Sequence, residues 1–236
     1  MEKKKQHRIL WVLDRAHGKN VQGKQSPDGS FIEWEYSERC ISLLYLAFNQ
    51  IGIDCVRTVT GDDEIGLSKR SAIANSYVES GKYDYVFLLS LHNNASVKPN
   101  TGTGIEIFIA PSSNDEELQE RDKLNKYISN VLGSFLEKKF ETRFKFRRHH
   151  PSIIYKQAPF TVLTGTKSKP AKYSGVLIEF GFMDNDKDLE LLKQDKTFDD
   201  YMAMLIYSVY GINAKIGYKD FKIFSNLNDF FNEVKF

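Results

Sequence analysis

The sequence has little cysteine, no long apolar run and almost no net charge. The roughly 18 or more consecutive apolar residues that a membrane-spanning helix needs occur nowhere in the 236 residues, so no membrane partner is expected. The two cysteines, Cys40 and Cys55, are too few for a disulfide scaffold, and we expect both to be reduced residues of the core. A net charge of +2 gives no electrostatic footprint for a nucleic-acid partner.

Two segments of the chain are locally basic and could suggest export or an anionic partner. The start, "MEKKKQHRILWVLD", imitates an export signal, but Asp14 cuts its apolar stretch short. We therefore expect a chain without a signal peptide that is made and folded in the cytoplasm. The run "RFKFRRHH" at 143–150 is basic enough to meet an anionic polymer. Basic side chains also protect exposed strand edges, and this second interpretation is favoured.

Short apolar runs alternate with longer helical patterns along the chain, which is typical of an α/β layered domain. Several apolar runs lack alternation, and this indicates a mostly parallel central sheet that is covered by helices on both faces. The apolar runs lie at 8–14, 53–59, 83–91, 104–110, 160–163 and 175–180, and the helical patterns at 33–50, 67–80, 115–140 and 199–210. The length favours one domain over 1–236, with a core at about 8–212 and a C-terminal extension at 213–236.

Three residues with chemically versatile side chains follow or end the apolar runs. His17 comes after the first run, His92 after "VFLLSL", and Glu179 ends "GVLI". In a mostly parallel sheet, sites assemble beyond the carboxyl ends of the strands. We therefore expect all three side chains at one edge of the sheet.

The helix after the first strand must begin at the same edge, and its first turn offers three glutamates. Helical periodicity selects one of them. The apolar seam steps back from Ile51 through Ala47, Leu44, Cys40 and Ser37 to Glu33. Glu35 and Glu38 fall on the opposite side of the helix and are expected to face solvent.

A carboxylate on the buried face of a helix needs a partner, because burying an unpaired charge is costly. A metal ion is one candidate partner of Glu33. An ion pair with Arg15 or Arg70 is the other, and spacing alone favours neither.

Two imidazoles and a carboxylate from separate elements, with a fourth position left to water, form the ligand set of a catalytic zinc. A second carboxylate nearby can move protons during hydrolysis, and Glu179 is the candidate. Each residue also has a simpler interpretation, with the histidines as turn residues and Glu179 turned to solvent. The compact HExxH motif and the GxSxG elbow are absent.

The motifs together resemble the zinc-dependent N-acetylmuramoyl-L-alanine amidases of the type-3 catalytic class. The resemblance covers about residues 8–212, with its motifs in the family's order and spacing. The matching segments are "LDRAHGKN", "FIEWEYSERC", "CVRTVTGDDEIGLSKRSAIAN", "SLHNNA", "GTGIEIF" and "VLIEFGFMDNDKDLELL". Arg15, Ala16 and Lys19 depart from the family pattern around the first histidine, but no ligand is lost.

The resemblance implies one Zn²⁺ ion held by His17, Glu33 and His92, with Glu179 as the catalytic glutamate. It implies peptidoglycan as the substrate, cut between N-acetylmuramic acid and L-alanine. The segment "SPDGSFIEWEYSER" is similar to phage lysins, so a monomeric endolysin that reaches the cell wall after release or export is expected. The loops at 93–104 and 164–172 are candidates for holding glycan and peptide. The alternatives are a wall-binding module without activity and a zinc peptidase that acts on the stem peptide.

Overall fold

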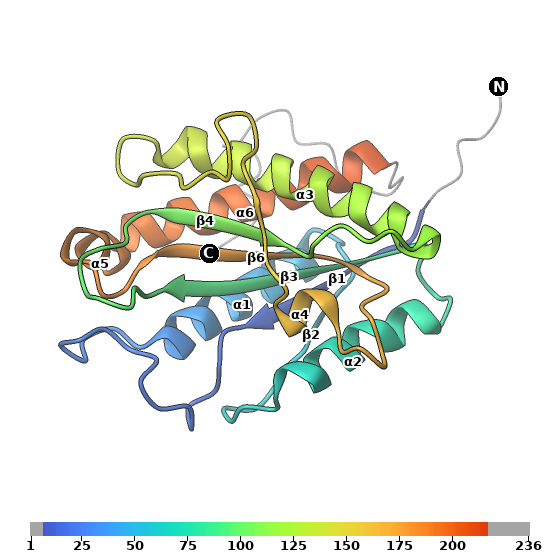
Figure 1. Cartoon of the computed structure of the whole chain (residues 1–236), viewed down its shortest axis with the longest axis horizontal. Coiled ribbons are helices and arrows are strands. Elements are labelled where there is room, and N and C mark those ends of the chain that lie inside the picture. The colour runs from blue at the N-terminus through green and yellow to red at the C-terminus, as the bar shows by residue number, and fades with distance from the viewer. Residues whose placement is uncertain (1–6, 217–236) are drawn as a thin grey trace.

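The computed structural model describes residues 7–216, which form one sheet with helices on both of its faces (Figure 1). The sheet has six strands in the order β2-β1-β3-β6-β4-β5. The strands are β1 (Ile9–Arg15), β2 (Cys55–Arg57), β3 (Tyr85–Asn94), β4 (Ile105–Ile109), β5 (Lys156–Gln157) and β6 (Ser174–Phe182). The helices are α1 (Glu33–Gln50), α2 (Leu67–Glu79), α3 (Glu116–Phe140), α4 (Thr161–Thr164), α5 (Asp186–Leu192) and α6 (Asp195–Ile216).

The expected mostly parallel sheet is confirmed. The strands β2, β1, β3 and β6 pair in parallel, whereas β4 runs antiparallel to β6 and carries β5 on its outer edge. The carboxyl ends of the four parallel strands therefore lie at one edge. The loops that leave β1 and β3 emerge at this edge, together with the start of α1 (Figure 1).

Two apolar cores cover the two faces of the sheet. The larger core joins alternate residues of the strands to α1, α3 and α6, and Trp11, Phe87 and Ile178 are fully buried in it. The smaller core joins the other face to α2 and α4 through residues such as Leu88 and Val162. This two-sided burial explains why the strand runs lack polar alternation.

The second face changes from apolar to polar toward the carboxyl edge. In β3, Leu88 belongs to the smaller core, and the next residues on that face are Ser90 and His92. In β6, Leu177 is followed on the same face by Glu179. Strand periodicity therefore delivers polar side chains to the end of the sheet where α1 begins.

Short elements differ from the sequence expectation. The run at 160–163 is a single turn of helix, α4, because Leu163 and Thr164 both donate backbone hydrogen bonds to the carbonyl of Phe160. Gly165, with φ of 70°, ends this turn. The helix α5 and the two-residue strand β5 were not predicted. The side chain of Asn185 caps α5, and β5 pairs with the edge of β4; both elements are too short to show a periodic pattern.

The structure also bears on the cysteines, the basic run and the C-terminal helix. Both cysteines are free; Cys40 is buried in the larger core, whereas Cys55 is only partly buried against it. No helix within residues 7–216 is long and apolar enough to span a membrane. In the basic run, the arginines at 143, 147 and 148 pair with Asp200, Glu106 and Glu137, and Phe146 lies against β4. The helix α6 continues to Ile216, and the remainder of the expected C-terminal extension lies outside the described residues.

Candidate metal centre and active site

Glu33 occupies the first turn of α1 and is only 2% exposed. Its backbone N–H donates to the carbonyl of Lys24, which ties the helix start to the preceding loop. Ser37, one turn later, accepts a hydrogen bond from the N–H of Ala16 and donates one to the carbonyl of Leu91. The helix is thereby fixed against the ends of β1 and β3, with the Glu33 carboxylate directed inward.

The alternative of an ion pair between Glu33 and an arginine is wrong in this structure. Arg70 pairs with Asp14 and Glu64, and Arg15 pairs with Glu38. Glu35 is exposed as expected. Glu38 does not simply face solvent, because it also forms an ion pair with Arg57 and is partly buried. A helical wheel cannot anticipate partners that come from other strands.

Glu33 instead contacts both predicted histidines. Its Oε1 lies 3.0 Å from Nδ1 of His92, and its Oε2 lies 3.3 Å from Nε2 of His17. The two imidazole rings are perpendicular, with centroids 5.3 Å apart. One ligand atom from each of the three residues lies within 4.8 Å of the others, and this group is the one potential metal cluster found in residues 7–216.

His17 lies on a loop rather than in the sheet. Its backbone has φ of 41°, in the left-handed region that residues other than glycine seldom adopt. The carbonyl of His17 accepts hydrogen bonds from Arg15 (2.6 Å) and Arg70 (3.1 Å), and both arginines are buried. Gly18 follows in close contact with the backbone of Glu64, where any side chain would collide. Side-chain hydrogen bonds and tight packing therefore hold this loop in place.

His92 lies inside β3, which runs further than expected, to Asn94. Its register partner in the neighbouring strand β6 is Glu179. Burial opposes protonation of His92, but its hydrogen bond to the Glu33 carboxylate and the charge of that carboxylate raise its pKa. Burial also opposes ionisation of Glu33, but the hydrogen bonds from the two histidines lower its pKa to about 2. These directions describe the metal-free chain.

Glu179 has an ionisable group without a hydrogen-bond partner. Its Oε2 atom is buried and makes no hydrogen bond within the described chain. Burial raises its pKa to about 7, and the charges of Glu33 and Glu106 act in the same direction, against the opposing effects of His92 and Lys24. A carboxyl group with a pKa near neutrality, next to a candidate metal site, is suited to proton transfer.

The sequence did not lead us to assign a role to Glu106, which is the register partner of Glu179 on the other side. Glu106 is 4% exposed and accepts hydrogen bonds from Asn94 (2.6 Å) and Arg147 (2.7 Å), and it also pairs with Lys156. The glutamate in the motif "GTGIEIF", on a strand otherwise formed by apolar residues, was the available signal. Glu106 is therefore a fixed negative charge beside Glu179.

The donor set fits a zinc ion. Two imidazoles and one carboxylate are the residue types that bind catalytic zinc, and they leave room for further ligands. A metal ion would also balance the charge of the buried Glu33 carboxylate. On β6, next to the strand that carries His92, Glu179 has a buried oxygen without a hydrogen-bond partner in the described chain. The residues present therefore agree with the group that the sequence led us to expect.

Of the two loops expected beside the site, one lies there. The loop between β3 and β4 leaves from the carboxyl edge, as expected for 93–104 (Figure 1). The segment 164–172 lies elsewhere, beside the second half of α2, where Asn75 hydrogen-bonds to Pro170 and Lys172. It precedes β6, so it leads to the amino end of that strand. The expectation that 164–172 flanks the same edge as the site is therefore wrong.

Fold and site together define an α/β protein with a candidate metal centre and a buried acid at the carboxyl edge of a mostly parallel sheet. The family model Amidase_3, described as N-acetylmuramoyl-L-alanine amidase, matches residues 12–209. The chain belongs to this family of type-3 amidases. Membership supports hydrolysis of an amide bond in peptidoglycan. No curated protein matches the sequence.

Solved structures with similar folds carry the same enzyme name. An N-acetylmuramoyl-L-alanine amidase from Clostridium difficile 630 has a TM-score of 0.69 at 21% identity, over 89% of this chain and 100% of that one. The catalytic domain of CwlV from Bacillus (Paenibacillus) polymyxa has a TM-score of 0.67 at 18% identity, over 86% of this chain and 97% of that one. AmiC2 of Nostoc punctiforme, also an N-acetylmuramoyl-L-alanine amidase, has a TM-score of 0.67 at 18% identity, over 88% of this chain and 98% of that one. At these identities the likeness establishes the fold.

Proposed function

We propose that this protein is a zinc-dependent N-acetylmuramoyl-L-alanine amidase that cuts the amide bond between muramic acid and L-alanine in peptidoglycan. The observation that carries the proposal is the convergence of His17, Glu33 and His92, with ligand atoms within 4.8 Å of one another, beside the buried carboxyl group of Glu179. Membership of the amidase family supports the substrate.

The three proposed ligands come from a loop, a helix and a strand, so folding assembles the site. Zinc held by them would polarise the scissile carbonyl and lower the pKa of a bound water to about 7. Glu179 accepts a proton from the attacking water and transfers it to the nitrogen that leaves with alanine. The new C–O bond forms at the lactyl carbonyl as the C–N bond breaks. In the metal-free chain, burial raises the pKa of Glu179 to about 7, close to the pH at which both proton transfers take place.

Product analysis tests the bond that is cut. Purified protein is incubated with bacterial cell walls, and the soluble and insoluble products are analysed for new termini. We expect free amino termini of alanine without new reducing ends of sugars. Peptides that are cut internally, or that stay joined to muramic acid, contradict the proposed bond.

Metal removal tests the zinc. Dialysis against a chelator is expected to abolish hydrolysis, and an equimolar addition of Zn²⁺ is expected to restore it. Metal analysis of the purified chain should give one zinc per chain. Full activity in a preparation without any bound metal contradicts the zinc proposal, while the product analysis still stands by itself.

We also propose that the protein acts as a phage-type endolysin, which reaches the wall after release or export. The support is the similarity of the segment "SPDGSFIEWEYSER" to that of phage lysins. Purified protein added to susceptible cells with a permeabilised outer barrier, or with none, should reduce turbidity. Wall hydrolysis in extracts without any lysis of cells contradicts the endolysin role but not the amidase activity.

A further inference from the structure

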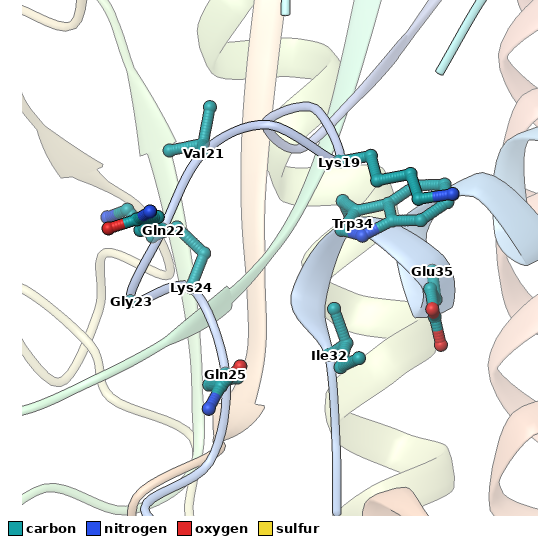
Figure 2. Close-up of a pocket in the computed structure, with 9 residues that line it drawn as sticks. All are labelled: Lys19, Val21, Gln22, Gly23, Lys24, Gln25, Ile32, Trp34 and Glu35. Atoms are coloured by element: carbon teal, nitrogen blue, oxygen red, sulfur yellow. The ribbon is translucent and has the colours of Figure 1, made fainter. Parts of the chain in front are cut away.

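A pocket of about 440 Å³ borders the start of α1, where Ile32 and Trp34 flank the proposed zinc ligand Glu33 in the chain, and it has no role in the reaction described above. Figure 2 shows it between the loop segment 19–25 and the start of α1, with Ile32, Trp34 and Glu35 on the helix side. Its volume is in the range of pockets that hold small ligands. It belongs to the loop that departs from the family pattern at Lys19, two residues after the first histidine.

The loop that forms the pocket is folded against α1. Gln25 and Ile32 form an antiparallel bridge, and the carbonyl of Lys24 accepts the backbone hydrogen bond of Glu33. Lys19 is held by a hydrogen bond from its N–H to the carbonyl of Asp62. The residues that border the pocket therefore have backbone positions tied to the metal site, since Ile32 and Trp34 flank Glu33 in the chain.

Two lysines make the pocket cationic. Lys24 is half-buried, and no hydrogen bond or ion pair joins its ammonium group to another residue in the part of the chain that the structure describes. Lys19 is an exposed second cation of the lining. Glu35 is the one acid among the lining residues, and it is exposed. An ammonium group without a protein partner can donate charge-assisted hydrogen bonds to an anionic ligand.

Trp34 adds an apolar surface beside these charges. Its ring is partly buried, and the guanidinium of Arg15 lies 5.7 Å from the ring centroid. The pocket thus offers a cation and an aromatic face, a combination that fits an acidic amino-acid residue with an aliphatic neighbour.

We propose that this pocket is the subsite for a carboxylate of the stem peptide, bound by Lys24 and packed against Trp34, just beyond the scissile amide. The inference rests on the proposed function, because the chemistry at Glu33 and Glu179 sets which bond of the peptide lies at the metal site. Lys19 strengthens the attraction from the exposed rim. A neutral, amidated peptide therefore binds less tightly than its acidic counterpart.

A fluorescence titration tests the subsite. The chain has two tryptophans, and Trp11 is fully buried in the core, so Trp34 reports binding in the pocket. The full-length E179Q chain, supplied with zinc, is titrated with a muramyl dipeptide that carries free carboxylates and with the same compound after amidation. The acidic compound is expected to bind about tenfold more tightly, which is the effect of one charge-assisted hydrogen bond.

Substitutions of pocket residues then test whether binding depends on this pocket. K24Q is expected to remove most of the tenfold preference, because it weakens binding of the acidic compound only. W34F should remove the change in fluorescence on binding, since only the buried Trp11 then remains. K69Q, which removes an exposed lysine on α2, is the matched control and should leave both affinities unchanged. Calorimetry repeats each titration without relying on tryptophan.

Three results overturn the inference: equal binding of both compounds, an equal effect of K24Q and K69Q, or no saturable binding of the acidic compound by either method. The proposed function fails separately. A chain that discriminates between the two compounds through Lys24 but releases no alanine termini from cell walls keeps the subsite and loses the amidase proposal. A chain that releases these termini but binds both compounds equally keeps the amidase proposal and loses the subsite.

Discussion

The proposed metal centre has a half that belongs to the sheet and a half that belongs to a loop. His92 and Glu179 are register partners in two long parallel strands, so backbone hydrogen bonds set their separation. His17 lies two residues beyond the end of β1, with a left-handed backbone that Arg15 and Arg70 hold through its carbonyl. The sheet half is positioned by repeating structure, and the loop half depends on individual side chains.

This difference predicts where substitutions act. In the sheet half, changing a functional side chain should remove chemistry and leave the fold intact, because the strands are held by other residues. In the loop half, changing a supporting side chain should disturb the fold or the metal affinity, although that side chain takes no part in the reaction.

The largest effect is expected from E179Q, in the sheet half. The amide keeps the size of the side chain but cannot accept the proton, so hydrolysis should fall on the order of 10²- to 10⁴-fold. Thermal unfolding and zinc content should stay close to those of the parent chain. If E179Q instead loses its zinc or unfolds at a much lower temperature, Glu179 has a structural role, and the comparison between the two halves breaks down.

The next largest effect is expected from R70M, in the loop half. Arg70 is 1% exposed and forms a 3.0 Å ion pair with the equally buried Asp14, which also binds the hydroxyls of Thr58 and Ser90. Its removal leaves the Asp14 charge without its cation, so the free energy of unfolding should drop by about 3–5 kcal/mol. Urea unfolding measures this drop.

An exposed ion pair supplies the control for R70M. K123M breaks the contact between Lys123 and Glu120, whose side chains are both largely exposed. Such pairs contribute about 0–1 kcal/mol, so this variant should resemble the parent chain. A loss of stability that is similar in R70M and K123M would show that the buried ion pair does not support the loop.

The sequence predicted the side chains of the site better than the contacts that hold them in place. Helical periodicity selected Glu33, and the strand ends selected His92 and Glu179, because regular elements repeat the direction of their side chains. The ion pairs of Arg15 with Glu38 and the anchoring of Glu106 were not predicted. They join residues that are far apart in the sequence, and no periodic pattern records such contacts. The single turn α4 was missed for a related reason, since four residues are too few to show a period.

R15M should have a smaller effect that is directed at the metal. Arg15 donates to the carbonyls of His17, Gly61 and Asp62, and its loss removes one of the two donors that fix the carbonyl of His17. We expect zinc affinity to fall about 10- to 100-fold, as for other residues that orient metal ligands. Competition with a chelator of known affinity measures the change.

The control for R15M is R57M, because Arg57 shares the partner Glu38 but forms no hydrogen bond or ion pair with the loop around His17 within the described residues. Zinc affinity in R57M should match that of the parent chain. If both variants lose zinc equally, the Glu38 ion pairs, rather than the hydrogen bonds to the loop, support the metal site.

The smallest effect is expected from pH on the metal-free chain. Burial, together with the charges of Glu33 and Glu106, raises the pKa of Glu179 from an ordinary value of 4.5 to about 7. The folded chain therefore keeps this proton at pH values where the unfolded chain has lost it. Its contribution to stability is complete below about pH 4.5, declines as the pH rises, and is lost above about pH 7.

The E179Q variant isolates this contribution, because glutamine does not titrate while Glu33 and His92 titrate in both chains. Between pH 6 and pH 8, the Tm of the metal-free parent chain should fall by a few °C more than the Tm of E179Q, as expected for a loss of about 1 kcal/mol in a chain of this length. Equal pH dependence in the two chains would mean that the Glu179 carboxyl group reaches water. In that case the strand register alone would not be sufficient to prepare a proton acceptor, and the sheet half of the site would depend on its surroundings as much as the loop half does.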